Sequence, residues 1–284
     1  MSGKVCLVTG ATSGIGRVTA RELARMDATV VAVGRNRQKG EETVAEIKRR
    51  SANDKVEFLQ ADLSSQESIR DLARTFTDKY DQLQVLVSNA GGVFSKRETT
   101  VDGLEMTFAL DHLAYFLLAT LLLPVLERSA PARIINVSSG AQGTGKIDFD
   151  DLQGGKRYSG WRAYSQAKLA NVLFTYELAR RLQGTGVTAN CLHPGFVATG
   201  FAQNNSGALQ ALIKAGQVFA ISPEKGAETS VFLASSPLVE GVSGKYFANK
   251  KEKKSAKQSY DESAARRLWD VSAQLTGTKD GASS

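Results

Sequence analysis

The stretch KVCLVTGATSGIGR, residues 4–17, sets the pattern for the whole chain. It opens with a short apolar run, typical of a buried strand, and continues into a segment with helical spacing of apolar residues. Gly10, Gly14 and Gly16 lie at the junction. Glycine lets the chain turn tightly there, and the start of the helix presents free N–H groups that can hold a pyrophosphate. The spacing is G-x-x-x-G-x-G and not G-x-G-x-x-G, so a glycine-rich turn without a ligand stays an alternative.

Strand-like and helix-like stretches alternate along most of the chain. The apolar, β-branched runs are residues 4–10, 28–34, 55–62, 84–91, 132–139 and 186–195. This alternation predicts an α/β fold with a mostly parallel sheet and helices on both faces, which right-handed crossovers make doubly wound and Rossmann-like. Ligands bind at the carboxyl ends of such strands. The unusual residues at those ends are Gly10, Arg35, Asp62, Asn89, Ser139 and Pro194.

The domain organisation follows from length and charge. The 284 residues contain no internal repeat and no linker-like segment, so we predict a single dinucleotide-binding catalytic domain over residues 1–284. Much of the net charge of +7 lies in NKKEKKSAK, residues 249–257, which we interpret as a solvated basic segment. No aromatic residues interleave with it, so a nucleic-acid partner is not expected. A C-terminal helix is predicted over about 260–275.

Composition argues against other classes of protein. Cys6 and Cys191 lie in apolar runs and are typical of buried side chains in a reducing compartment, which favours the cytoplasm. No cluster of cysteine and histidine has metal-ligand spacing. The chain shows no signal peptide. The longest apolar segment, residues 108–126, contains Asp111, His112 and Pro124, so we expect a buried helix and no membrane span.

The end of the second predicted strand indicates the cofactor. The chain reads VGRNRQK at residues 33–39, with Arg35 and Arg37 and no carboxylate. A bare ribose 2′-hydroxyl is usually held by an acidic residue at this point, whereas a 2′-phosphate is held by arginine. Arg17, directly after Gly16, can reach the same phosphate. These cations favour NADP(H) over NAD(H); the alternative is a set of basic surface residues in a loop.

Six motifs in order resemble the short-chain dehydrogenase/reductase family over nearly the whole chain. They are TGATSGIGR at 9–17, ADL at 61–63, NAGG at 89–92, INVSS at 135–139, YSQAK at 164–168 and HPGFVAT at 193–199. The tail DESAARRLWDVSAQLTG, residues 261–277, and the wide gap between Ser139 and Tyr164 resemble the retinol dehydrogenase-like branch. Members of that branch often carry an N-terminal membrane anchor, which this sequence lacks, so a soluble relative is expected.

The resemblance implies a role for individual residues. Ser139, Tyr164 and Lys168 match the catalytic residues, with Ser138 as the competitor for the serine role. Thr199 is expected to bond the nicotinamide carboxamide, and Asp62 to contact the adenine. The residues that match cofactor-binding positions are Gly10, Thr12, Ser13, Gly14, Ile15, Gly16, Asp62, Leu63, Asn89, Ala90, Gly91, Tyr164, Lys168, Pro194, Gly195, Val197 and Thr199.

Tyr164 and Lys168 suggest a mechanism. Residues four apart are neighbours on a helix, and a tyrosine with the usual pKa of about 10 is a poor acid–base catalyst at neutral pH. The ammonium of Lys168 and the positive ring of the oxidised cofactor are expected to lower the pKa of Tyr164. In reduction, hydride passes to a carbonyl carbon while Tyr164 protonates the oxygen and Ser139 orients it. Lys168 is also expected to hold the nicotinamide ribose.

One position departs from the family. In TFALDHLAYF, residues 107–116, the family usually has an asparagine where this chain has Asp111. That asparagine helps to hold a water that links the lysine to solvent, whereas an ionised aspartate cannot donate a hydrogen bond. Asp111 is expected to pair with Lys168 and weaken its effect on Tyr164, which would reduce activity or raise the pH optimum. The neighbouring His112 is expected to be structural.

The sequence therefore predicts an NADP(H)-dependent carbonyl reductase or alcohol dehydrogenase (EC 1.1.1.-). The expected substrate is an apolar aldehyde or ketone, or a retinoid- or steroid-like alcohol, under an apolar lid at residues 201–219. The alternative is a cofactor-binding regulatory protein whose catalysis is weakened by Asp111. A homodimer and a monomer are both compatible with the sequence. An alternative role as a structural oligomer has no distinctive support.

Overall fold

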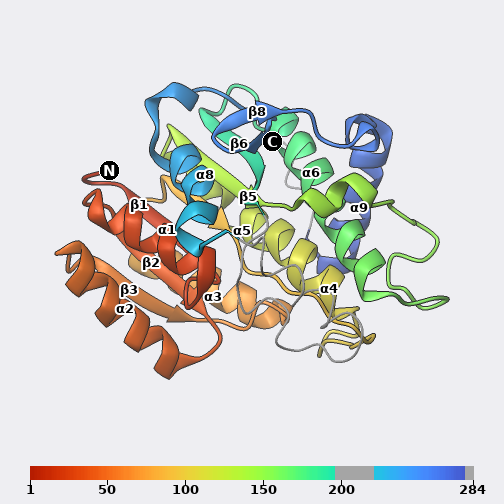
Figure 1. The fold of residues 1–284 in the computed structure, drawn as a ribbon, viewed down its shortest axis with the longest axis horizontal. Helices are drawn as coiled ribbons and strands as arrows, with labels where there is room; N and C mark the ends of the chain where they lie inside the picture. The colour runs from red at the N-terminus through yellow and green to blue at the C-terminus, as the bar shows by residue number, and fades with distance from the viewer. Residues whose placement is uncertain (196–220, 279–284) are drawn as a thin grey trace.

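The computed structural model describes residues 1–195 and 221–278. Within them lies one eight-stranded sheet of order β3-β2-β1-β4-β5-β6-β7-β8 (Figure 1). All neighbouring strands are parallel except β7 and β8. This confirms the predicted doubly wound, mostly parallel sheet. The strands are β1 Val5–Thr9, β2 Thr29–Gly34, β3 Val56–Gln60, β4 Val85–Ser88, β5 Ala132–Val137, β6 Val187–His193, β7 Tyr246–Ala248 and β8 Lys251–Lys253.

Helices cover both faces of the sheet because alternate strand residues point to opposite sides. On one face Cys6 and Val8 of β1 pack with α1, α2 and α8, and on the other face Leu7 packs with α3, α5, α6 and α9. The helices are α1 Gly14–Arg25, α2 Arg37–Ser51, α3 Gln66–Lys79, α4 Met106–Phe108, α5 Ala114–Arg128, α6 Gly160–Arg181, α8 Pro223–Ser235 and α9 Glu262–Thr276. Shorter turns are η1 Ala109–Leu113, η2 Gly140–Thr144, η5 Pro237–Val239 and η6 Lys257–Tyr260.

The most apolar stretch forms a helix of the core. Within the described residues, Met106–Arg128 is long and apolar enough to cross a membrane, judged by length and composition alone. It comprises α4, η1 and α5, and 72% of its most apolar window is buried in the fold. Such burial is what a core helix requires, in agreement with the prediction for residues 108–126. Within this stretch, η1 is a turn of π-helix, a feature that the sequence pattern did not indicate.

The C-terminal part adds an edge that sequence reasoning missed. The basic segment 249–257 was interpreted only as solvated, yet Lys251–Lys253 forms the antiparallel edge strand β8. Its side chains are exposed, and lysine on an edge strand discourages pairing with other chains. The helix α9 occupies the range in which a C-terminal helix was predicted. Cys6 and Cys191 are both buried and free, as expected for small apolar side chains.

Candidate active site

The glycine loop packs closely against the end of β4. Gly10 has a φ of +64°, and a Cβ there would lie 2.9 Å from the Cα of Ala90. At Gly16 a Cβ would collide with the Asn89 amide and the Gly10 carbonyl. Asn89 is fixed by its side-chain NH₂, which donates to the Thr9 carbonyl at 2.8 Å. The loop therefore needs glycine at these positions to lie against the sheet.

The start of α1 suits a pyrophosphate. Ser13 is the N-cap residue, but its side chain makes no capping hydrogen bond, and the first turn contains no acidic residue. The N–H groups of that turn thus keep the partial positive charge of a helix N-terminus, which no carboxylate of the turn itself neutralises. Together with the close-packed glycines Gly10 and Gly16, which we call the glycine cradle, this donor set fits the diphosphate of a nicotinamide dinucleotide.

The three predicted cations of the ribose site differ in their surroundings. Arg17 lies 3.3 Å from Glu46 of α2. Arg37 donates to the Gln60 side chain at 3.3 Å. The guanidinium of Arg35, at the end of β2, has no hydrogen bond or ion pair with any other described residue. Arg35 is therefore the cation that is most available for a 2′-phosphate.

Asp62, the predicted adenine contact, lies just after β3. Asp62 accepts hydrogen bonds from the backbone N–H and the hydroxyl of Ser64, at 3.0 and 2.7 Å. Its own N–H donates to Ser68 on α3 at 2.9 Å. Leu63, the next residue, is buried in the core and anchors this turn to it. Asp62 is thus held in a fixed turn at the carboxyl edge of the sheet, where sequence reasoning placed it.

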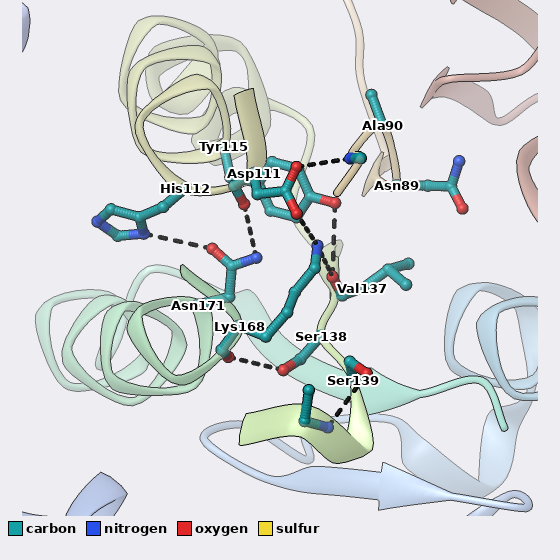
Figure 2. Close-up of polar contacts among 12 residues, drawn as sticks. Asn89, Ala90, Asp111, His112, Tyr115, Val137, Ser138, Ser139, Lys168 and Asn171 are labelled. Carbon is teal, nitrogen blue, oxygen red and sulfur yellow. Dashed lines mark hydrogen bonds and ion pairs between the residues drawn. The ribbon is translucent and has the colours of Figure 1, made fainter. Parts of the chain in front are cut away.

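Tyr164 and Lys168 lie one turn apart on α6. Tyr164 is only 6% exposed, and its hydroxyl forms a hydrogen bond with Ser139. Lys168 is buried, and its Nζ lies 3.2 Å from Asp111 Oδ2 and 3.4 Å from the Val137 carbonyl oxygen. Figure 2 draws both contacts as dashed lines. The structure thus brings together the four residues for which a catalytic role was predicted.

The ammonium of Lys168 is enclosed on further sides. It lies 5.4 Å from the centre of the Tyr115 ring and 5.6 Å from the centre of the Tyr164 ring, within cation–π range. A Cβ on Gly91 would lie 2.9 Å from Asp111 Oδ1 and 3.2 Å from Lys168 Nζ. Gly91 therefore leaves space for the ion pair, which explains the need for a small residue in this motif.

The electrostatics differ from the sequence-based expectation at Tyr164. Burial raises the pKa of Tyr164, the charge of Asp111 raises it further, and the hydrogen bond with Ser139 lowers it. We expected the ammonium of Lys168 and the positive ring of the oxidised cofactor to lower this pKa. Burial is the largest cause of the rise, and the charge of Asp111, which pairs with that ammonium, adds to it. The prediction that Asp111 pairs with Lys168 is thus confirmed, whereas the predicted direction for Tyr164 is wrong for the protein alone.

Asp111 is held by the π-helical turn η1. Its Oδ1 accepts a hydrogen bond from the Gly92 N–H at 2.7 Å. Burial raises the pKa of the Asp111 carboxyl, while the Lys168 ammonium and the Gly92 N–H lower it. The backbone carbonyl of Asp111 accepts from the Asn171 side chain at 2.8 Å. Asn171 was missed from the sequence, although it lies three residues after Lys168 and thus on the same side of the helix.

His112 is structural, as expected. Its ring is fully buried between Asn171, at 3.3 Å from Nδ1, and Ser272 of α9, at 3.0 Å from Nε2. Burial lowers the pKa of His112 to about 4, so the ring is neutral at physiological pH. It joins the π-helical turn to the C-terminal helix.

The two serines of the INVSS motif have different environments. The Ser138 hydroxyl is buried and donates to the backbone carbonyl of Lys168 at 2.7 Å. Ser139 is partly exposed, is the N-cap residue of η2, and is the serine that is bonded to Tyr164. The geometry thus favours Ser139 for substrate contact and gives Ser138 a packing role.

This assignment predicts opposite effects of two alanine variants. Ser139→Ala should lower kcat about 100-fold, because a hydrogen bond to the reacting oxygen is lost. Ser138→Ala should lower the free energy of unfolding by about 1 kcal/mol and leave kcat largely intact. Steady-state kinetics and thermal unfolding of both variants check this. A larger loss of kcat in Ser138→Ala would reverse the assignment.

The predicted nicotinamide loop is only partly described. Pro194 and Gly195 follow β6 at the same edge of the sheet as Ser139, and Gly195 has a φ of +94°. Val197, Thr199 and the predicted lid 201–219 lie outside the described residues. No group of three potential metal ligands occurs among residues 1–195 and 221–278.

Comparison with known proteins gives the class to which this fold and site belong. Residues 4–209 match the family model described as short chain dehydrogenase. A crystal structure of an uncharacterised protein from Mycobacterium paratuberculosis is 34% identical, with a TM-score of 0.80 over 98% of this chain and 95% of that chain. The chain belongs to the short-chain dehydrogenase/reductase family of oxidoreductases.

Curated relatives indicate the branch. Retinol dehydrogenase 12 of Mus musculus is 45% identical over 97% of this chain and 87% of its own length. Retinol dehydrogenase 14 of Homo sapiens is 42% identical over 98% of this chain and 87% of its own length. These similarities place the chain in the retinol dehydrogenase-like branch, as the motifs predicted.

Proposed function

We propose that the protein is an NADP(H)-dependent oxidoreductase that acts on an apolar carbonyl or alcohol, of which retinoid-like compounds are the leading class. The observation that carries the reaction type is the assembly of Ser139, Tyr164 and Lys168 beside the glycine cradle. When bound, the dinucleotide supplies or accepts the hydride. Tyr164 gives a proton to the substrate oxygen in reduction and takes it back in oxidation, and Ser139 orients that oxygen.

NADP(H) is supported by the surroundings of Arg35. Its guanidinium is free of protein partners among the described residues, and it extends from the strand end where the ribose of such cofactors lies. A solved relative with 26% identity, RhlG of Pseudomonas aeruginosa, was determined in an active-site complex with NADP, with a TM-score of 0.69 over 87% of this chain. An arginine fork suits a phosphate better than a hydroxyl.

An apolar substrate is supported by Trp161. This residue lies one helical turn before Tyr164, and their ring centres are 6.2 Å apart. The Trp161 side chain is 51% exposed, which is unusual for so large an apolar group. A flat, half-exposed ring beside the acid–base residue suits an extended hydrophobic substrate. The retinol named for the curated relatives belongs to this chemical class.

A substrate panel tests the proposal. Oxidation of NADPH and of NADH is followed at about 340 nm with retinaldehyde, aliphatic aldehydes, ketones and a polar sugar aldehyde. We expect turnover of the apolar aldehydes with NADPH, and a much lower kcat/KM with NADH. A protein that binds NADPH but turns over none of the panel would instead support a regulatory role.

From the buried free cysteines we also propose a reducing, cytoplasmic location.

The cofactor preference gives a second prediction. Arg35→Ala should weaken NADPH binding by about 10- to 100-fold, because a charge-assisted hydrogen bond to the 2′-phosphate is lost, and should leave NADH binding nearly unchanged. Calorimetric titration of both cofactors measures this. Arg25→Ala, which removes an exposed charge at the far end of α1, serves as the control. An equal loss for both cofactors would contradict the assignment of Arg35.

A further inference from the structure

His193 continues the pairing of two strands into the turn that carries Ser139. The last backbone hydrogen bond between β5 and β6 runs from the Ser138 N–H to the Leu192 carbonyl at 2.8 Å. Beyond it, the Gly140 N–H donates to Nδ1 of His193 at 2.9 Å. At Gly140 the acceptor is therefore a side-chain nitrogen of β6, where a backbone carbonyl of β6 would accept in a continuing sheet. The residue held in this way is the one directly after Ser139.

The same nitrogen is also the acceptor of a second, longer hydrogen bond. The Gly195 N–H points to His193 Nδ1 at 3.4 Å. Gly195 lies in the segment whose motif predicts contact with the nicotinamide end of the cofactor. One imidazole nitrogen therefore links the turn of Ser139 to the start of that segment.

These bonds define the state of the ring. A nitrogen that accepts from an N–H group carries no proton of its own, so the proton of a neutral His193 lies on Nε2. The ring packs against Gly140, where a Cβ would lie 3.3 Å from Cε1. A protonated ring would present an N–H to the Gly140 N–H, and the bond would be lost.

From this geometry we infer that His193 is a positioning residue of the reaction, which fixes the Ser139 turn and Gly195 relative to each other only while its ring is neutral. The inference rests on the proposed function for its kinetic consequence. Its structural part, the hold on Gly140, can be measured without turnover. His193 is not required to touch the substrate.

The pKa of His193 is shifted by burial and not by the charged groups around it. Opposite His193 in the sheet is Ala248, and beyond it Lys251 of β8. The turn η2, GAQGT, has no titratable side chain. The titratable side chains in the first half of α6 are Arg162, Tyr164 and Lys168, and those of α8 are Glu224, Lys225 and Glu228. Glu228 is paired with Lys225 and Lys250. Burial alone lowers the pKa of His193 below its usual value.

Two variants of equal shape separate positioning from packing. Asparagine and leucine both branch at Cγ, but only asparagine places an acceptor, Oδ1, where histidine has Nδ1. We expect His193→Leu to lower kcat for aldehyde reduction about tenfold and His193→Asn to stay close to wild type. In the cofactor-free protein, the Gly140 amide, followed by NMR hydrogen exchange, should exchange about tenfold faster in His193→Leu only.

The pH profile adds a readout that packing would not move. As the pH falls through the lowered pKa of His193, the wild-type kcat for reduction should decline because Nδ1 becomes protonated. His193→Asn should lack this acid limb. If both variants exchange Gly140 alike, or if His193→Asn keeps the acid limb, the inference is overturned. If the wild type turns over no substrate, the proposed function fails, and the exchange of Gly140 alone still decides whether His193 holds the turn.

Discussion

Replacement of Tyr164 by phenylalanine should reduce kcat for carbonyl reduction by about 10²- to 10⁴-fold, the usual contribution of a positioned general acid. The phenol is buried, bonded to Ser139, and next to the enclosed ammonium of Lys168. Phenylalanine keeps the packing against Trp161 but cannot give up a proton. Binding of NADPH should therefore change little. Rapid-quench or steady-state kinetics with retinaldehyde and NADPH measure the loss.

Tyr115 offers a matched control. Its ring lies as close to Lys168 as that of Tyr164, and it is also buried, but its hydroxyl donates to the Val137 carbonyl at 3.4 Å. Tyr115→Phe should keep kcat within a few-fold of wild type, because that phenol transfers no proton. Equal losses in the two variants would show that packing around Lys168 matters and acid–base chemistry at Tyr164 does not.

Asp111→Asn is expected to move the pH–rate profile toward lower pH. The negative charge of Asp111 raises the pKa of Tyr164, so its removal should lower that pKa. In alcohol oxidation Tyr164 acts when deprotonated, and the rate rises with pH. The rising limb should thus shift to lower pH, with a gain in kcat of about tenfold at neutral pH. In reduction, where the protonated form acts, the falling limb should shift in the same direction.

A second buried carboxylate controls for the loss of any charge. Glu105 caps α4 by accepting from the N–H groups of Thr107 and Phe108. Glu105→Gln should lower the free energy of unfolding without a shift of the pH–rate profile. Asp111→Asn also removes the partner of a buried ammonium, so thermal unfolding should be recorded for both variants. Superimposable profiles of wild type and Asp111→Asn would remove any special role for Asp111, including the idea that it weakens catalysis.

The fold and the glycine loop could be predicted because they depend on short-range patterns. Gly10 and Gly16 are six residues apart in the sequence, and each apolar run predicts its own strand. The edge strand β8 was missed, since Lys251–Lys253 carries no apolar residue and pairs only because β7 lies beside it. The π-helical turn η1 is bonded to Asn171 of α6, a contact between segments about 60 residues apart that no local pattern indicates.

The site was predictable in its residues more than in its electrostatics. Tyr164 and Lys168 are four residues apart, so their proximity follows from the helix. The pairing of Asp111 with Lys168 was inferred from charge, but the dominance of burial over that charge at Tyr164 depends on packing. The hold of His193 on Gly140 joins residues 53 apart in sequence and has no local signature. The partners of Arg17 and Arg37 on the surface could not be anticipated either.

A crystal structure of the complex with NADPH tests the central claim most directly. We predict that the hydroxyls of Tyr164 and Ser139 both face the reactive carbon of the nicotinamide, with room for a substrate oxygen at about 3 Å from each. Arg35 is expected to contact the 2′-phosphate. A nicotinamide bound away from Tyr164, with its hydroxyl buried against other side chains, would contradict the account.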